Sequence, residues 1–147
     1  MRGGGSRLIN EANSMSKPKR VAPDIRERTV RYAVRAIELY RFVQSGQDGA
    51  GRVIAKQYLR AATSIGANVE EAHSGESRAD FIHKFGIAQK EAWECSYWLR
   101  LMAESTIVFS QRLAAIRRET EEICAVLTAI IVNAKRKAKS QTRVSGG

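Results

Sequence analysis

Apolar residues recur at alternating intervals of four and three along one long segment of the chain, and this repeat constrains the fold more than any other feature. Its members are Phe81, Phe85, Ala88, Ala92, Cys95, Leu99 and Met102. An average interval of about 3.5 residues keeps one face of an α-helix turned toward a neighbouring helix over many turns. The repeat therefore predicts a long helix that lies along the seam of a helical bundle.

Three other segments have the period of an amphipathic helix, at about residues 24–45, 52–73 and 110–133. The predicted core residues are Val30, Val34, Ile37 and Phe42 in the first, Ile54, Tyr58, Ala61, Ile65, Val69 and Ala72 in the second, and Leu113, Ile116, Thr120, Ile123, Leu127 and Ile130 in the third. No segment alternates between apolar and polar residues as a strand does. Short connections favour antiparallel neighbours, so we predict an all-α fold, an antiparallel up-down-up-down four-helix bundle over residues 23–137.

Basic residues are concentrated at the two ends of the chain. Residues 1–35 carry nine lysines and arginines against three acidic residues, residues 36–134 carry eleven against twelve, and residues 135–147 carry five against none. Residues 1–22 and 138–147 have little to bury, and we expect both to be disordered basic segments. Basic ends on a nearly neutral bundle attract polyanions such as nucleic acid. The candidate nucleic-acid contacts are Arg28, Arg31, Arg35, Lys135, Arg136, Lys137 and Lys139.

The sequence also indicates a compartment. The first 23 residues contain no apolar run of the signal-peptide kind, and no later window approaches the roughly 20 apolar residues of a membrane span. We therefore expect a cytoplasmic protein with no membrane partner. Cys95 and Cys124 have no C-x-x-C pattern and no histidine at ligand spacing, so we expect reduced thiols in the core.

Polar residues at helical spacing between residues 57 and 94 raise the alternative of a chemical site. Glu70 and His73 have the E-x-x-H spacing by which one helix offers two metal ligands. A carboxylate-bridged metal site in a bundle needs a second such motif and two further glutamates, and the sequence lacks the second motif. We expect no metal, no cofactor and no catalytic residue, and instead a hydrogen-bond network between helices or subunits. Its candidate members are Gln57, Arg60, Ser64, Asn68, Glu71, Glu91 and Glu94.

Two stretches of the chain carry polar and aromatic residues at specific positions, "QYLRAATSIGANVEEA" and "SRADFIHKFGIAQKEAWECSYWLRLM". The most specific positions are Gln57, Arg60, Ser64, Asn68, Glu71, Asp80, Phe81, Ala88, Glu91, Glu94, Tyr97, Trp98 and Leu99. In these positions the chain resembles the four-helix-bundle proteins that are named for open reading frames in 23S rRNA intervening sequences. The resemblance extends over roughly residues 24–137.

The resemblance implies a compact antiparallel bundle that assembles as a ring-like homopentamer without enzymatic activity. A related branch, the accessory variability determinant of diversity-generating retroelements, has the same pentameric bundle with a basic surface and assists a reverse transcriptase on RNA. A reverse transcriptase is therefore an alternative partner. Trp93, Tyr97 and Arg100 lie on one line outside the apolar repeat, where we expect a subunit interface, with stacking on unpaired bases as the alternative.

Two hypotheses about function follow from these features. The first is a non-enzymatic, homo-oligomeric nucleic-acid-binding protein, with RNA preferred because of the family context. The second is a pentameric scaffold that binds another protein, including a retroelement reverse transcriptase, and whose basic ends are incidental. Affinity for nucleic acid that falls steeply with salt separates the two, because phosphate contacts release counterions.

Overall fold

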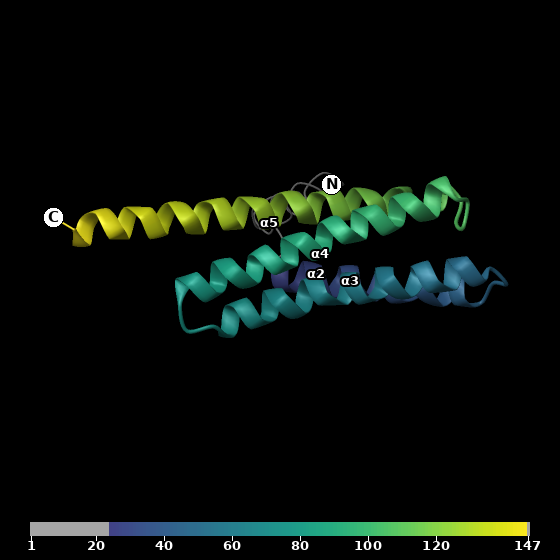
Figure 1. The fold of residues 1–147 in the computed structure, drawn as a ribbon, viewed down its shortest axis with the longest axis horizontal. Coiled ribbons are helices and arrows are strands. Elements are labelled where there is room, and N and C mark those ends of the chain that lie inside the picture. The colour runs from purple at the N-terminus through teal and green to yellow at the C-terminus, as the bar shows by residue number, and fades with distance from the viewer. Residues whose placement is uncertain (1–23, 147) are drawn as a thin grey trace, which may run out of the picture.

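Four helices make up the part of the chain that the structure describes. A computed structural model places residues 24–146, and the predicted disordered segment 1–22 lies outside the described residues. The helices are α2 (Ile25–Gln44), α3 (Gly49–Ser74), α4 (Arg78–Glu104) and α5 (Ser110–Ser145). Consecutive helices run in opposite directions and pack side by side (Figure 1). The predicted all-α up-down bundle is therefore confirmed.

Short polar side chains start three of the helices at positions close to the predicted ones. The side chains of Asp24, Asp48 and Ser77 each accept a hydrogen bond from a main-chain amide in the first turn of the following helix. Asp48 explains why α3 begins at Gly49, three residues before the predicted start, in a stretch that reads as a glycine loop. Gly51 is buried there, and a Cβ atom on it would lie 3.0 Å from Ile107 of the α4–α5 connection.

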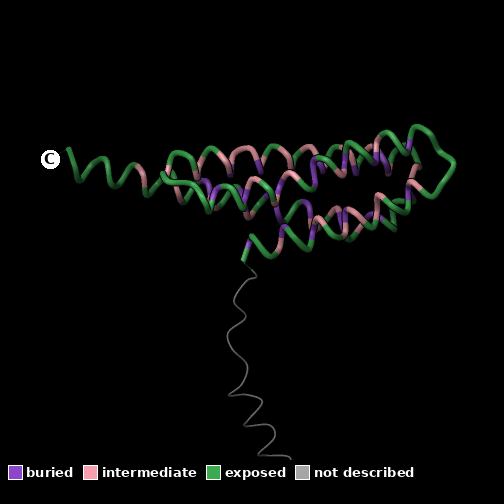
Figure 2. The backbone as a smooth tube through the Cα atoms, turned by 90° about the horizontal axis from the view of Figure 1, so that it is seen from below, coloured by how far each residue is buried: buried purple, intermediate pink, exposed green. Residues whose placement is uncertain are grey.

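The core lies between the helices along the predicted seams (Figure 2). On α4, the repeat from Phe85 to Met102 is fully buried, and Phe81 at its start is partly buried. The predicted stripes of α3 and α5 are buried as well, apart from Ile54 and Ile130, which are partly buried. Cys95 and Cys124 are free, buried thiols, as expected.

The predicted core face of α2 is wrong. Val30, Val34 and Phe42 are 50%, 49% and 47% exposed, and Ile37 is only partly buried. The residues that α2 buries are Ile25, Thr29, Tyr32, Ala36 and Val43. The helix is turned so that Tyr32 enters the core, and Val30 and Val34 remain on the outer face.

The predicted disordered tail at residues 138–147 is also not observed, because α5 continues as a helix to Ser145. Alanine, lysine, arginine and glutamine are good helix formers, and neither proline nor glycine interrupts the helix before Gly146. A helix that is already formed adds residues without a new nucleation cost. With 36 residues, α5 is about 54 Å long, and its end extends past the bundle (Figure 1).

A chain of buried hydroxyl groups joins α2, α3 and α5 inside the core. The Thr120 hydroxyl donates to the Ile116 carbonyl over 2.7 Å, so its oxygen accepts from Tyr32, also over 2.7 Å. The Tyr58 hydroxyl donates to the Tyr32 oxygen over 3.0 Å. Each hydroxyl proton in the chain therefore has an acceptor. Burial raises the pKa of both tyrosines above the ordinary value, which keeps them protonated.

Removing the middle of this chain should cost more than removing its end. Tyr32→Phe leaves the buried Tyr58 hydroxyl without an acceptor, and we expect the free energy of unfolding to fall by about 1–3 kcal/mol. Tyr58→Phe strands no donor and should cost about 0.5–1.5 kcal/mol. Urea denaturation at one fixed protein concentration measures both values. A loss for Tyr58→Phe equal to or larger than that for Tyr32→Phe would contradict the proposed direction of the chain.

Candidate nucleic-acid interface

The exposed end of α5 carries the highest density of basic side chains in the described structure. Lys135, Arg136, Lys137, Lys139 and Arg143 are all exposed, and no acidic residue follows Glu122 in the sequence. Successive residues of an α-helix are rotated by about 100° around its axis, so four of these five side chains lie within an arc of roughly 100°. This basic stripe consists of Lys135, Arg136, Lys139 and Arg143. Lys137 points to another side of α5, and it lines a pocket beside α4.

The predicted arginine face of α2 is partly matched by carboxylates. Arg28 donates two hydrogen bonds to Glu119 of α5, at 2.8 and 3.1 Å, and a third to Glu122. Arg31 lies 3.8 Å from Glu27 on its own helix. Arg35 lies beside Arg31 at the same surface. Arg28 therefore ties α2 to α5, and α2 contributes less free positive charge than the sequence predicts.

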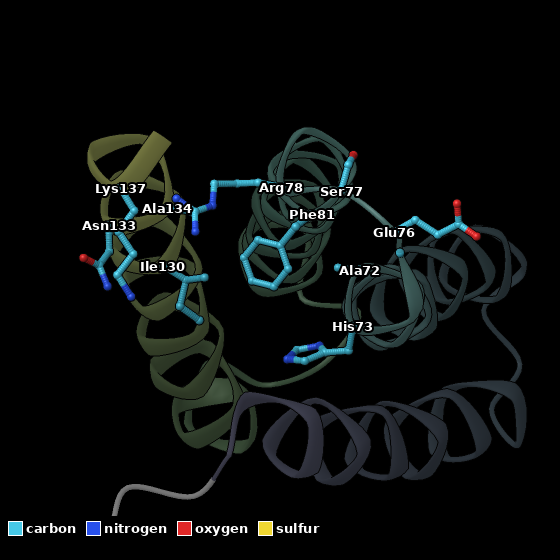
Figure 3. A pocket seen from close by; sticks show the side chains of 11 residues that line it. Ala72, His73, Glu76, Ser77, Arg78, Phe81, Ile130, Asn133, Ala134 and Lys137 are labelled. Atoms are coloured by element: carbon cyan, nitrogen blue, oxygen red, sulfur yellow. The ribbon is translucent and has the colours of Figure 1, made fainter. Parts of the chain in front are cut away.

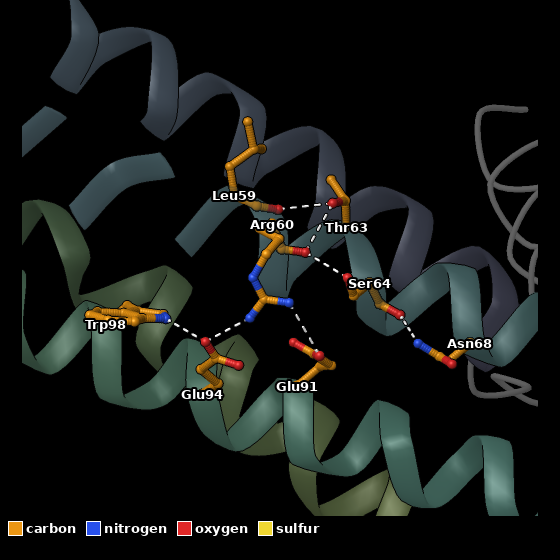
Figure 4. A network of polar contacts seen from close by, with 8 residues as sticks. All are labelled: Leu59, Arg60, Thr63, Ser64, Asn68, Glu91, Glu94 and Trp98. Carbon is orange, nitrogen blue, oxygen red and sulfur yellow. Dashed lines mark hydrogen bonds and ion pairs between the residues drawn. The ribbon is translucent and has the colours of Figure 1, made fainter. Parts of the chain in front are cut away.

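Three of the polar residues predicted to form a network, Arg60, Glu91 and Glu94, meet between α3 and α4 (Figure 4). Arg60 of α3 donates to Glu94 over 2.7 Å and to Glu91 over 3.3 Å. Trp98 donates its indole N–H to Glu94 over 3.1 Å. The hydrogen bond from Arg60 lowers the pKa of Glu94, which keeps this carboxylate ionised. Trp98 was not predicted as a member, although its place four residues after Glu94 is a usable signal.

The remaining members of the predicted network make local contacts. The Ser64 hydroxyl donates to the Arg60 carbonyl over 2.8 Å, and the Asn68 amide donates to the Ser64 carbonyl over 2.8 Å (Figure 4). Glu71 pairs with Lys84 of α4 over 2.6 Å, a partner that the spacing does not indicate. Gln57 is exposed at the surface of α3. Of these residues, only Glu71 joins α3 to α4, and their arrangement offers no paired nucleophile and base.

Both groups of the E-x-x-H motif have structural partners. Glu70 accepts two hydrogen bonds from Arg26, at 3.2 and 2.8 Å. The His73 Nδ1 atom lies 2.8 Å from the Val69 carbonyl, and its ring packs edge-on against Phe81, with 5.8 Å between centroids. Within residues 24–146, no three acidic, histidine or cysteine side chains gather in a way that could hold a metal ion.

The candidate subunit interface lies on the outer face of α4. Trp93 and Tyr97 are 55% and 57% exposed, and Arg100 pairs with Glu104 one turn later over 3.1 Å. Large aromatic side chains that are exposed one turn apart favour contact with a partner, because they bury much area at little conformational cost.

None of the four helices described, α2 to α5, has an apolar stretch of the length that a membrane span requires.

Comparison with known proteins identifies a family for most of the described chain. Residues 25–129 match the 23S rRNA-intervening sequence protein family. The chain belongs to that family. The match spans α2, α3, α4 and most of α5, whereas the basic stripe lies beyond residue 129. Family membership therefore accounts for the bundle and does not by itself account for the basic stripe.

A solved structure has the same fold. It is described as a protein of unknown function from the S23 ribosomal protein family of Bacteroides thetaiotaomicron. This chain is 39% identical to it, and the superposition has a TM-score of 0.67 over 74% of this chain and 98% of that one. No curated protein sequence matches the chain.

The contact between Arg28 and Glu119 should make the stability of the bundle depend on pH. The hydrogen bond from Arg28 lowers the pKa of Glu119 in the folded state. This stabilisation is complete above the unfolded pKa of about 4.3 and is lost as the pH falls through the lowered folded value. Glu119→Gln should reduce the Tm by about 3 °C at pH 7, and its difference from wild type should shrink below about pH 4.

Thermal unfolding followed by circular dichroism between pH 2 and pH 7 measures this difference. The exposed Glu38→Gln, on α2, makes the same change of charge and serves as the control. A Tm difference for Glu119→Gln that stays constant over the whole pH range would contradict the ion-pair account.

Proposed function

We propose that this protein is a non-enzymatic, homo-oligomeric nucleic-acid-binding protein that prefers RNA. The observation that carries the proposal is the basic stripe, held on a continuous helix that extends beyond the bundle and has no acidic residue near it in sequence. Lysine and arginine side chains on such a helix fit the phosphates of a nucleic acid backbone. The contacts would position the protein with little reading of sequence, because phosphates carry no base identity.

Membership of a family named for 23S rRNA intervening sequences supports RNA as the polyanion. The absence of acidic residues after Glu122 also matters, because one sign of charge along a helix produces a broad field that attracts an anionic polymer. The scaffold hypothesis stays as the alternative. In that case the same oligomer would bind a protein such as a reverse transcriptase.

The proposed oligomer rests on two apolar surfaces at opposite corners of the bundle. Helix α2 packs against α3 and α5, and α4 packs against the same two helices, so α2 and α4 lie diagonally across the core. The outer face of α2 exposes Val30 and Val34, and that of α4 exposes Trp93 and Tyr97. If the α2 face of one copy contacts the α4 face of the next, the contact is head-to-tail, and such contacts form a ring when the rotation between copies closes. Five copies is the number that the family resemblance implies.

Neutralising the basic stripe should remove most of the affinity for RNA. We expect the fourfold variant Lys135→Gln, Arg136→Gln, Lys139→Gln and Arg143→Gln to bind single-stranded RNA more weakly. The slope of log K against log salt should fall in magnitude by about 3, because each lost phosphate contact removes about 0.7. Fluorescence anisotropy with labelled RNA at several salt concentrations measures both quantities.

The matched control neutralises four exposed basic residues elsewhere on the bundle, namely Arg41, Lys56, Lys90 and Arg118. It makes the same change of net charge and should keep most of the affinity and the salt slope. Equal losses in the two variants would reduce the effect to net charge alone. No RNA binding by the assembled wild-type protein would contradict the proposed function and leave the scaffold hypothesis.

Two single substitutions test the oligomer, one on each of its proposed faces. Val34→Glu and Trp93→Glu should each prevent ring closure, because a charge would be buried at the contact. An equimolar mixture of the two variants should form a dimer, since one intact α2 face and one intact α4 face remain. Multi-angle light scattering measures the masses. Val53→Glu, at a 61% exposed position of α3, is the control. A full ring in either single variant would contradict this interface.

A further inference from the structure

A pocket of about 520 Å³ opens where the end of α3 and the start of α4 pass alongside α5 (Figure 3). Its walls are formed by the α3–α4 connection, the first turn of α4 and the part of α5 next to the point where this helix extends past the bundle. The polar residues that line it are His73, Glu76, Ser77, Arg78, Asn133 and Lys137. The pocket is the point at which the bundle and the extended end of α5 meet.

Arg78 has a guanidinium nitrogen that lacks a partner. Its Nη1 atom is buried and makes no hydrogen bond to any residue in the range 24–146. The side chain reaches from α4 toward α5 beside Ala134 (Figure 3). Buried polar groups in folded proteins are nearly always hydrogen-bonded, so this guanidinium nitrogen calls for an acceptor from outside residues 24–146, and a bound ligand can supply one.

The charges around the pocket favour an anionic ligand. Lys137 lines it from α5, opposite Arg78 of α4, so two cations from two helices border one space. Glu76 is the only acidic side chain among the described residues that line it, and it points away from Arg78 (Figure 3). The pocket also adjoins the first turn of α4, the positive end of that helix dipole, and the same turn carries one carboxylate, Asp80.

We propose that this pocket binds a phosphate group, with Arg78 and Lys137 as its two cationic contacts. The planar guanidinium of Arg78 presents paired N–H donors that match two phosphate oxygens, and Lys137 supplies a second charge. In the protein's function the phosphate belongs to the backbone of the bound nucleic acid, so this inference rests on the function proposed above. A free phosphate or a mononucleotide has the same chemistry and is the other source of such a group.

The volume and walls of the pocket also fit a phosphate that is attached to a larger molecule. A space of about 520 Å³ exceeds what one phosphate occupies, and Phe81, partly buried, forms part of the wall. An aromatic face beside a phosphate site allows a nucleotide base to stack. The α5 wall from Ile130 to Lys137 lies beyond the residues that match the family, so family membership does not assign this pocket.

The pocket gives the basic stripe a fixed starting point. Lys135 and Lys139 lie on α5 on either side of Lys137 in sequence, and the stripe continues outward from the pocket to Arg143. Because the stripe lies on another side of α5 from Lys137, a strand whose phosphate is held between Arg78 and Lys137 would pass around the helix to bring its neighbouring phosphates to the stripe. A site between two helices constrains a phosphate more than an exposed lysine does, so each of its contacts should contribute more to affinity.

The test uses the full-length protein with Arg78→Gln, Lys137→Gln and the control Lys90→Gln, an exposed position of α4 outside the pocket. In a first experiment, labelled single-stranded RNA is titrated at one salt concentration. We expect the two pocket variants to lose about tenfold in affinity, the loss of one charge-assisted contact. The control should stay within about threefold of wild type. Circular dichroism reports whether each variant is folded. If Arg78→Gln does not fold, the RNA affinity of Lys137→Gln alone tests the proposal.

A second experiment measures the Tm in inorganic phosphate and in adenosine monophosphate, against chloride at equal ionic strength. Phosphate stabilises proteins in general, so a rise in Tm is not by itself evidence for the site. Binding at the site is indicated by a rise in Tm that saturates with ligand concentration, that the pocket variants lose and that Lys90→Gln keeps. That result supports the proposal with a free phosphate as a ligand. A tenfold RNA effect without such a rise supports it with the nucleic acid backbone as the source.

The proposal is overturned if both pocket variants bind RNA as tightly as Lys90→Gln does and keep the same response to phosphate. This outcome leaves the proposed function intact as long as the fourfold stripe variant loses RNA binding. If the wild-type protein binds no RNA, the proposed function fails, and the phosphate titration alone then decides the pocket. A saturable phosphate effect lost in Arg78→Gln and Lys137→Gln would support the site, and its absence would reject it.

Discussion

The rotation of α2 about its own axis depends on the buried chain of hydroxyl groups that runs from Tyr58 through Tyr32 to Thr120. Each buried hydroxyl needs a partner, so Tyr32 has to face both α3 and α5. Because Val30 and Val34 lie about 200° around the helix from Tyr32, the same rotation turns them outward. A hydrogen-bond requirement in the core thus produces an apolar surface outside it.

The same rotation also decides how much positive charge α2 can present. Arg28 lies one turn before Tyr32, so it points toward α5 as Tyr32 does, and it meets Glu119 and Glu122 there. A guanidinium with two carboxylate partners adds little to the field around the protein. Among residues 24–146, charge on the bundle is therefore largely balanced, and the unbalanced charge lies on the end of α5. This division explains how one chain combines a nearly neutral body with a strongly basic extension.

How much the sequence predicts depends on what each helix buries. On α3, α4 and α5 one apolar stripe forms the core, so the period alone identifies the buried residues. On α2 the core face contains Thr29 and Tyr32, which look less hydrophobic than the valines opposite, and their partners on other helices cannot be read from the helix itself. The polar positions of α3 and α4 were predicted from spacing, and the place of Trp98 four residues after Glu94 also indicates its contact, whereas Lys84 of α4 meets Glu71 of α3 only through packing. Composition alone misread the end of α5 as disordered.

The helical state of the end of α5 affects how it can bind a polyanion. A disordered basic tail loses conformational entropy when a ligand orders it, and this loss reduces its affinity. A helix holds its side chains at set intervals before binding, so only side-chain freedom remains to be lost. It also holds one face of basic residues away from the bundle, while Lys137 on another face stays beside Arg78. A single helix can therefore present a broad electrostatic surface along its length and one defined anion contact at its base.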